Sequence, residues 1–302
     1  MENPKQSRVL VTGGAGMLGS QVLLCVPDGV SAVGTDLREA PGVPSAGVDL
    51  ADDGEVERLF REEGPFTGVI HTAAYTAVDD AEDDEELAYR VNALACVVLA
   101  RRCERDDIPL VAVGTDFVFD GEKREPYTEL DEPNPISAYG RTKLAGERLA
   151  VEEHPRGTRV VRTQWLYGPR GKHFPGKMQE LARQLLDGER ESLRVVADQY
   201  GSPTSTLELA PALWDVLRHG RESLYHAACE GSCSWYEWAL ATLEYSGLDG
   251  VEIEPCPASE YPRKASVPAY SVLDCSRLAR LRERGLAPWR EALKTYLGSE
   301  DR

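Results

Sequence analysis

Tyr139 and Lys143, spaced four residues apart, carry the clearest chemical signal in this sequence of 302 residues. On a helix, residues i and i+4 share one face, so the phenol and the ammonium point into the same cleft. A nearby cation stabilises a phenolate, and we therefore expect Lys143 to lower the pKa of Tyr139 toward neutrality. Thr115 follows an apolar stretch, and its hydroxyl is expected to bond the carbonyl oxygen that Tyr139 protonates. Together the three side chains indicate hydride transfer to a ketone.

A glycine-rich segment near the N-terminus offers a site for the hydride donor. Gly13, Gly16 and Gly19 come after the apolar residues 9–11 and open a helical pattern. Where a strand turns tightly into a helix, glycines let a pyrophosphate approach the positive end of the helix dipole. This context predicts a dinucleotide site. The alternative interpretation is a turn that only packs the helix onto the strand.

Acidic residues after the next two expected strands bear on the choice of cofactor. Asp36 ends the second strand, where a carboxylate can accept both hydrogen bonds from an adenosine ribose. It would repel a 2′-phosphate, and Arg38, two residues further on, can offset that repulsion. Electrostatics therefore favours NADH and leaves NADPH open. Asp49 and Leu50 follow the third short strand, where an acid can bond the adenine amino group.

The elements that must hold these residues alternate in type along the first half of the chain. Short apolar runs at 8–11, 31–35, 68–71, 110–114 and 159–162 predict strands, and longer patterns at 17–25, 53–63, 85–105 and 136–153 predict helices. This alternation predicts an α/β fold, a Rossmann-type doubly wound parallel sheet with a smaller C-terminal substrate domain. We expect residues 1–165 to form the NAD(P)-binding domain, with part of 190–225 returning to it. Residues 166–302 are expected to be mainly substrate-binding.

Several further segments, together with the glycine loop and the Tyr-x-x-x-Lys pair, resemble one family. The sequence is similar to the dTDP-4-dehydrorhamnose reductase family of the extended short-chain dehydrogenase/reductase superfamily. The resemblance keeps its order from residue 9 to about 297 and covers nearly the whole chain. Its blocks are AAYTAVD at 73–79, GTDFVFDG at 114–121, YGRTKLAGE at 139–147, RTQWLYG at 162–168, DQYGSPT at 198–204 and SVLD at 271–274.

The resemblance implies a role for each matched position. Thr115 and Asp116 would hold the substrate at its sugar, Tyr139 would donate the proton, Lys143 would bond the nicotinamide ribose, and Trp165 would pack against substrate. Positions implied for the cofactor, NADPH or NADH, are Gly16, Met17 and Leu18 at the pyrophosphate and Asp36, Asp49, Leu50, Ala74, Tyr75 and Thr76 along its path. The implied reaction reduces the C4 ketone of a dTDP-linked 6-deoxyhexulose to give dTDP-L-rhamnose. A homodimer is also expected.

Other activities within the superfamily make different demands on the same site. Sugar-nucleotide dehydratases carry Asp-Glu after the threonine, whereas this chain has Asp116-Phe117, which argues against dehydration. A nucleotide-sugar epimerase would keep the fold and retain NAD⁺. A regulatory subunit resembling that of methionine adenosyltransferase would bind a nucleotide without turnover, although it need not keep Thr115, Tyr139 and Lys143.

Composition excludes several other classes of protein. The chain has 34 basic and 51 acidic residues, a net charge of −17, and this field repels nucleic acid. No apolar run reaches the length of a membrane span, and the polar N-terminus does not resemble a signal peptide. Seven cysteines without a CxxC pair indicate free thiols in a reducing compartment, so we expect a cytoplasmic protein. The scattered histidines give no metal site.

Overall fold

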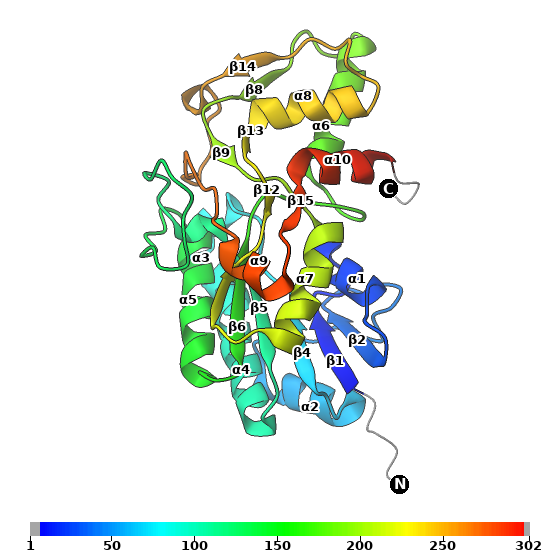
Figure 1. Ribbon diagram of the computed structural model, residues 1–302, viewed down its shortest axis with the longest axis vertical. Coiled ribbons are helices and arrows are strands. Elements are labelled where there is room, and N and C mark those ends of the chain that lie inside the picture. Colours follow the sequence, from blue (N-terminus) through cyan, green and yellow to red (C-terminus); the bar gives the residue numbers. More distant parts are fainter. Residues whose placement is uncertain (1–6, 299–302) are drawn as a thin grey trace.

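Seven parallel strands form one sheet at the centre of the computed structural model, which describes residues 7–298 (Figure 1). Their order is β11-β6-β5-β4-β1-β2-β3, and every neighbouring pair is parallel. All five predicted strands are present, and β3 and β11 complete the edges. The bounds are β1 (Ser7–Thr12), β2 (Val30–Asp36), β3 (Ser45–Ala46), β4 (Gly68–His71), β5 (Leu110–Thr115), β6 (Thr158–Thr163) and β11 (Leu224–His226).

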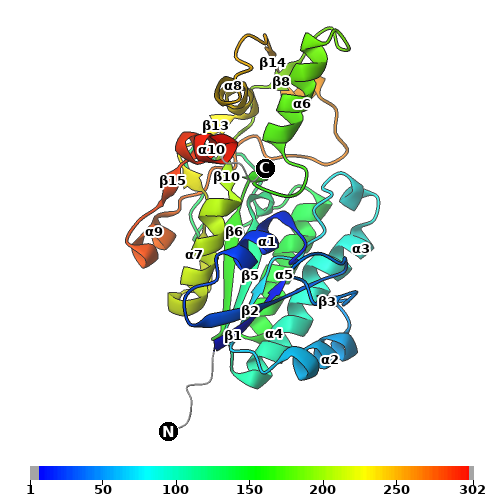
Figure 2. The ribbon, with the colours of Figure 1, turned by 90° about the vertical axis from the view of Figure 1, so that its right-hand side faces the viewer.

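Helices cover both faces of this sheet (Figure 2). One face packs against α1 (Met17–Leu24) and α7 (Thr206–His219). The other face packs against α2 (Asp53–Glu63), α4 (Ala95–Asp106) and α5 (Ala138–Glu153). Because both faces are covered, the central strands read as continuous apolar runs instead of alternating ones. The predicted Rossmann-type, doubly wound fold class is confirmed.

The stretch predicted as one helix over 85–105 contains a wider turn. It consists of α3 (Glu85–Tyr89), a π-helical turn (Arg90–Leu94) and α4, without a break in the chain direction. A π turn adds one residue to the helical repeat and so redirects the side chains around it, and such turns often occur at functional sites. Here it turns Asn92 into the protein interior, where the side chain is 1% exposed.

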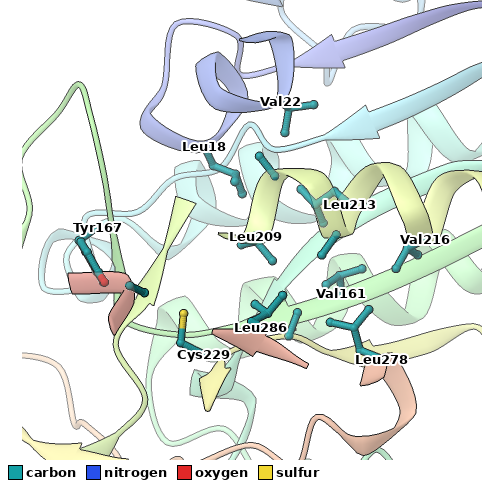
Figure 3. Packing of buried hydrophobic residues seen from close by; sticks show 14 of the residues in the cluster. Leu18, Val22, Val161, Tyr167, Leu209, Leu213, Val216, Cys229, Leu278 and Leu286 are labelled. Atoms are coloured by element: carbon teal, nitrogen blue, oxygen red, sulfur yellow. The ribbon is translucent and has the colours of Figure 1, made fainter. Parts of the chain in front are cut away.

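The chain leaves the sheet after β6 and later returns to it. On returning it forms α7 and β11, which pairs with β6 at the sheet edge. Figure 3 shows Leu209, Leu213 and Val216 of α7 among side chains from α1, β6 and β15 (Leu286–Pro288). Within this cluster the Trp214 indole Nε1 donates a hydrogen bond to the Val22 carbonyl at 3.0 Å. The returning segment is therefore an integral part of the large lobe.

A smaller lobe stands at the carboxyl ends of the strands (Figure 1). Its own apolar cluster includes Met178, Val195 and Leu243. No helix in the described range is long and apolar enough to cross a bilayer. The elements of this lobe, which we call the small lobe, are α6 (Phe174–Leu186), β8 (Arg194–Val196), α8 (Trp235–Tyr245), β14 (Glu254–Cys256) and α10 (Trp289–Gly298). Short strands join the lobes: β7 (Leu166–Tyr167), β9 (Tyr200–Gly201), β10 (Thr204–Ser205), β12 (Cys229–Glu230) and β13 (Cys233–Ser234). The short helix α9 (Ser276–Arg282) completes the fold.

A buried ion pair fixes α5 to the sheet. Glu147 on α5 accepts hydrogen bonds from the Arg162 guanidinium on β6 at 2.8 and 2.9 Å, and the two side chains are only 7% and 5% exposed. Gly114 on β5 makes room for the pair, because a Cβ there would lie 2.2 Å from Glu147 Oε1. A single buried charge left without its partner is strongly destabilising.

We expect Arg162→Met to lower the free energy of unfolding by about 3–5 kcal/mol, since it strands the Glu147 carboxylate. The double variant Arg162→Met with Glu147→Leu removes both charges and should recover most of that loss. Arg148→Met is the control, because Arg148 pairs with Glu132 on the surface at 61% and 86% exposure and such pairs contribute less than about 1 kcal/mol. Guanidinium unfolding monitored by circular dichroism measures all three. Equal stability of Arg162→Met and the control would contradict this role.

Candidate active site

The glycine loop joins β1 to α1 in a geometry that only glycine permits. Gly13 has φ +69°, and a Cβ on it would lie 2.7 Å from the Ala73 nitrogen. A Cβ on Gly19 would lie 2.1 Å from the Gly13 carbonyl oxygen, so helix and loop touch backbone to backbone. Met17 and Leu18 stand at the first positions of α1, where N–H groups lack an intrahelical acceptor. The loop is therefore a cradle with free donors at the positive end of a helix.

Asp36 reaches the loop from the end of β2. Its carboxylate accepts hydrogen bonds from the Ala15 nitrogen at 3.1 Å and the Arg38 nitrogen at 3.0 Å. The Arg38 guanidinium lies 3.6 Å away and is 73% exposed, whereas Asp36 is 11% exposed. The structure thus brings Asp36 and the glycine loop together and leaves an exposed arginine beside them.

Asp49 and Leu50 differ in what they present to a ligand. Asp49 pairs with Arg90 of the π turn at 2.6 Å. Burial raises the pKa of Asp49, but hydrogen bonds from Arg90 and Ala51 outweigh it and hold the pKa below its usual range. Leu50 is 8% exposed and belongs to the apolar cluster under α2, so only its main chain is available.

Residues 74–76 follow β4, next to the glycine loop, and their main chain is fixed by Asn92. The Asn92 amide accepts from the Tyr75 nitrogen at 2.9 Å and donates to the Tyr75 oxygen at 3.3 Å. It also donates to Thr142 Oγ1 on α5 at 3.1 Å. Ala74 and Tyr75 are half-buried and Thr76 is exposed. Asn92 thus connects the segment implied for the cofactor to α5, a link that sequence reasoning missed; its only signal was an amide within an apolar pattern.

Thr115, Tyr139 and Lys143 converge at the carboxyl end of β5. Thr115 ends β5, and Tyr139 lies in the first turn of α5, which Ser137 caps through the Gly140 nitrogen. The Tyr139 ring packs edge to face against Phe117 with centroids 5.5 Å apart, and the Thr115 hydroxyl lies close enough to the phenol to act on its pKa. Lys143, one turn further along, donates to the Val113 carbonyl of β5 at 2.7 Å and is 5% exposed. All three side chains belong to one polar cluster.

The predicted lowering of the Tyr139 pKa by Lys143 is wrong for this structure. Burial raises the pKa of Tyr139 to about 12; the Thr115 hydrogen bond opposes the shift, while the charges of Asp116 and Glu147 add to it. The Lys143 ammonium is held by the Val113 carbonyl. The phenol therefore keeps its proton at neutral pH and can donate it.

Asp116 lies beside this trio and is almost fully buried, at 2% exposure. Burial raises the pKa of Asp116 to about 6, although hydrogen bonds from Ser271 and Thr115 act in the opposite direction. The Thr115 hydroxyl donates to Asp116 Oδ1 at 3.1 Å. Asp116 therefore contacts Thr115, one of the three catalytic candidates, directly.

Trp165 begins an aromatic stack that leads from β6 into the small lobe. It has φ +47°, an unusual conformation for a bulky residue. Its ring stacks on Trp235 with centroids 3.8 Å apart and planes inclined by 17°. Gly201 leaves space for the indole, because a Cβ there would lie 2.5 Å from Trp165 Cε2.

A cavity of about 610 Å³ opens beside Trp235. Asp79, from the loop after β4, and Arg263 both line it, and their side chains pair at 3.1 Å. Next to them Lys264 pairs with Asp83, and the Ala265 nitrogen donates to Asp79 Oδ1 at 3.1 Å. The other lining residues include the aromatic and basic side chains Phe174, Arg190, Arg194, Trp235 and Tyr261. Nothing in the sequence spacing joins residues 190–194 to the site.

Among residues 7–298 no group of three or more His, Cys, Asp or Glu side chains is arranged to hold a metal ion. The polar groups gathered at the carboxyl edge of the sheet are instead a phenol, an ammonium, a hydroxyl and a carboxyl. Their chemistry is proton donation and carbonyl polarisation.

Comparison with known proteins gives matches along nearly the whole chain. The sequence profile described as RmlD substrate binding domain matches residues 7–301. A dTDP-4-dehydrorhamnose reductase of Mycolicibacterium smegmatis is 39% identical over 290 residues, covering 95% of this chain and 84% of the relative. The chain belongs to the dTDP-4-dehydrorhamnose reductase family. Another relative, the dTDP-4-keto-6-deoxy-D-glucose reductase of Streptomyces niveus, is 37% identical and covers 95% of each chain.

A solved structure of the family has the same fold throughout. The dTDP-4-dehydrorhamnose reductase of Bacillus anthracis in complex with NADP superposes with a TM-score of 0.87 at 33% identity. The match covers 96% of this chain and 98% of that one. Both lobes of this family member are therefore included in the likeness.

Gly201→Ala tests whether the Trp165 stack depends on the missing side chain. The new methyl group would collide with the indole, so we expect a loss of near-ultraviolet circular dichroism from the tryptophan stack. Stability should fall by about 1–3 kcal/mol, as in other overpacked cores. Gly250→Ala is the matched control, since a Cβ there meets nothing within 4 Å. Identical spectra for the two variants would refute this packing role.

Proposed function

We propose that the protein uses NADPH or NADH to reduce the C4 ketone of a dTDP-linked 6-deoxy-4-keto sugar, with dTDP-4-dehydro-L-rhamnose as the first candidate and dTDP-L-rhamnose as its product. The observation that carries the proposal is the convergence of Thr115, Tyr139 and Lys143 at the end of β5. Family membership supports the substrate class, because relatives are named for 4-keto reductions of dTDP sugars.

The cofactor site fits a dinucleotide. The glycine cradle excludes side chains, and the first N–H groups of α1 offer a pyrophosphate unpaired donors. In the proposed arrangement Gly13, Gly16, Met17, Leu18 and Gly19 hold the pyrophosphate. The residues assigned to the rest of the cofactor path are Asp36, Asp49, Leu50, Ala74, Tyr75, Thr76, Tyr139 and Lys143. A relative that is 33% identical is described in complex with NADP, and the exposed Arg38 suits a 2′-phosphate.

A reduced nicotinamide bound there would supply the hydride to the carbonyl carbon. Tyr139 protonates the carbonyl oxygen, and its raised pKa keeps the phenol protonated at neutral pH. Thr115 orients the same oxygen through its hydroxyl. Lys143 is fixed against β5 by the Val113 carbonyl, one turn from the phenol, where its ammonium can hold a ribose hydroxyl.

The small lobe is the proposed substrate-binding unit, made mainly of residues 166–302. Residues 1–165 form the cofactor unit, with part of 190–225 returning to it; the pairing of β11 with β6 and the packing of α7 support that return. The cavity next to Trp235 supplies aromatic rings for a base and the guanidinium groups of Arg190, Arg194 and Arg263 for a diphosphate. Asp116 and Trp165 complete the sugar subsite.

The cellular location and the oligomeric state of the protein are also part of the proposal. All seven cysteines are free thiols, which supports a reducing, cytoplasmic setting. The homodimer stays a prediction from the resemblance, and sedimentation velocity measures it.

Tyr139→Phe tests the proton donor. We expect turnover to fall by about 10²–10⁴-fold, the usual contribution of a general acid, while the cofactor still binds. Tyr89→Phe is the control, because Tyr89 is an exposed tyrosine at 38%. Absorbance of NADPH during turnover of dTDP-4-keto sugars measures the rates, and quenching of tryptophan fluorescence measures cofactor binding. Full turnover by Tyr139→Phe would remove the proposed role.

The same assay separates reduction from the other superfamily activities. A reductase consumes one reduced cofactor per product, whereas an epimerase consumes none and a regulatory subunit forms no product. Wild-type protein that consumes no NADPH or NADH with any dTDP-, GDP-, UDP- or CDP-4-keto sugar would overturn the proposal.

Arg263→Ala tests the anion subsite. We expect the KM for the nucleotide sugar to rise by about tenfold or more with little change in kcat, because a charge-assisted hydrogen bond is worth about 1.5–3 kcal/mol. Lys264→Ala is the matched control: it also loses a salt bridge to the loop after β4, but Lys264 does not line the cavity. Equal KM values for the two variants would place the diphosphate elsewhere.

A further inference from the structure

The Thr115 hydroxyl has one proton and more than one possible acceptor. Its oxygen accepts from the Phe117 nitrogen at 3.2 Å, and the hydroxyl donates to Asp116 Oδ1 at 3.1 Å. The Tyr139 phenol also lies close enough to the Thr115 hydroxyl for the two groups to interact. While its proton points at Asp116, Thr115 cannot donate to the oxygen of a substrate. The direction of this one proton therefore decides whether Thr115 can polarise a carbonyl.

The protonation state of Asp116 controls that direction. An ionised carboxylate is an acceptor only, and a hydrogen bond to it is about twice as strong as a neutral one, so it retains the Thr115 proton. A protonated carboxyl can itself donate to Thr115 Oγ1. The Thr115 proton is then released toward the space that Tyr139 faces.

We propose that Asp116 is a positioning residue that acts through Thr115, and that reduction requires Asp116 in its protonated form. The inference rests on the proposed function. The hydride and the Tyr139 proton together complete the alcohol, and the Asp116 proton stays on Asp116, so the balance of the reaction is unchanged. Asp116 does not need to reach the reacting oxygen.

The surroundings of Asp116 suit this role. Its Oδ1 accepts the Thr115 hydroxyl at 3.1 Å, its buried Oδ2 has no hydrogen-bond partner among the described residues, and the Ser271 hydroxyl is close enough to lower its pKa. From α5 the ionisable groups are Tyr139 closest to it, with Lys143 and Glu147 further along the helix; Lys143 is bound to the Val113 carbonyl and Glu147 to Arg162. Burial raises the pKa of Asp116 to about 6, so both forms are populated near neutral pH.

The pH dependence of kcat/KM tests the proposal. In wild-type protein we expect kcat/KM to fall about tenfold per pH unit above the Asp116 pKa. At high pH the wild-type kcat/KM should reach that of Thr115→Val and fall no further. The total decrease should be about 10²–10³-fold, because only one hydrogen-bond donor is lost. The Tyr139 pKa lies far higher and produces no fall in this range.

Three variants identify the group responsible. Asp116→Asn keeps an amide that can donate to Thr115 at every pH, so its kcat/KM should lose the fall. Because Asp116 also belongs to the proposed sugar subsite, the test is the shape of this pH profile and not the level of kcat/KM. Thr115→Val should be slow and independent of pH over the same range. Glu132→Gln, which removes an exposed acid on the surface, is the control and should keep the wild-type profile. A fall that persists in Thr115→Val would overturn the proposal, because Asp116 would then act without Thr115.

A measurement without turnover follows Asp116 directly. The infrared difference between wild type and Asp116→Asn should contain a protonated carboxyl band at low pH that disappears as pH rises, with the same midpoint as kcat/KM. A carboxylate that is ionised throughout, or a flat wild-type profile in an active reductase, would overturn the inference alone. Wild-type protein that reduces no 4-keto sugar would overturn the proposed function as well.

Discussion

The close backbone approach of α5 to the turn that follows β5 and to the π turn before α4 is the constraint on which the rest of the site depends. A Cβ on Gly140 would lie 2.2 Å from the Phe117 carbonyl, and one on Gly146 would lie 2.1 Å from the Asn92 carbonyl. Between these two contacts Lys143 reaches the Val113 carbonyl of β5. Because the helix cannot move outward without losing these contacts, the phenol, the ammonium and the end of β5 keep one fixed relation.

Burial gives this arrangement its acid–base character. The same exclusion of water that raises the pKa of Tyr139 to about 12 raises that of Asp116 to about 6. Both groups therefore bind protons more tightly than they would in solution, as a site that delivers a proton to a carbonyl requires. The opposite expectation for Tyr139 considered the charge of Lys143 alone. Composition and spacing do not report the depth at which a side chain lies, which here decides the direction of the shift.

Sequence patterns predicted the parts of the fold that repeat, and they missed the parts that depend on contacts between distant segments. Strand and helix bounds in the first half agree closely, since apolar periodicity records burial residue by residue. The Tyr-x-x-x-Lys spacing likewise located α5. The role of Asn92 was not predicted, because a single π turn produces no recognisable periodicity in the sequence. The pair between Arg263 and Asp79 joins residues 184 positions apart, and no local pattern encodes such a contact.

Two arginine ion pairs in this chain differ in exposure, and the difference decides whether the arginine stabilises the fold or can bind a ligand. Arg162 and Glu147 are buried, so replacing either partner would leave a buried charge unpaired, and the pair holds α5 on the sheet. Arg263 and Asp79 are 36% and 39% exposed, and surface pairs of this kind contribute little to stability. Arg263 can therefore exchange Asp79 for a phosphate at low cost. In a protein with a net charge of −17, a guanidinium kept near the cavity by a weak partner gives an anionic substrate a local attraction that the overall field lacks.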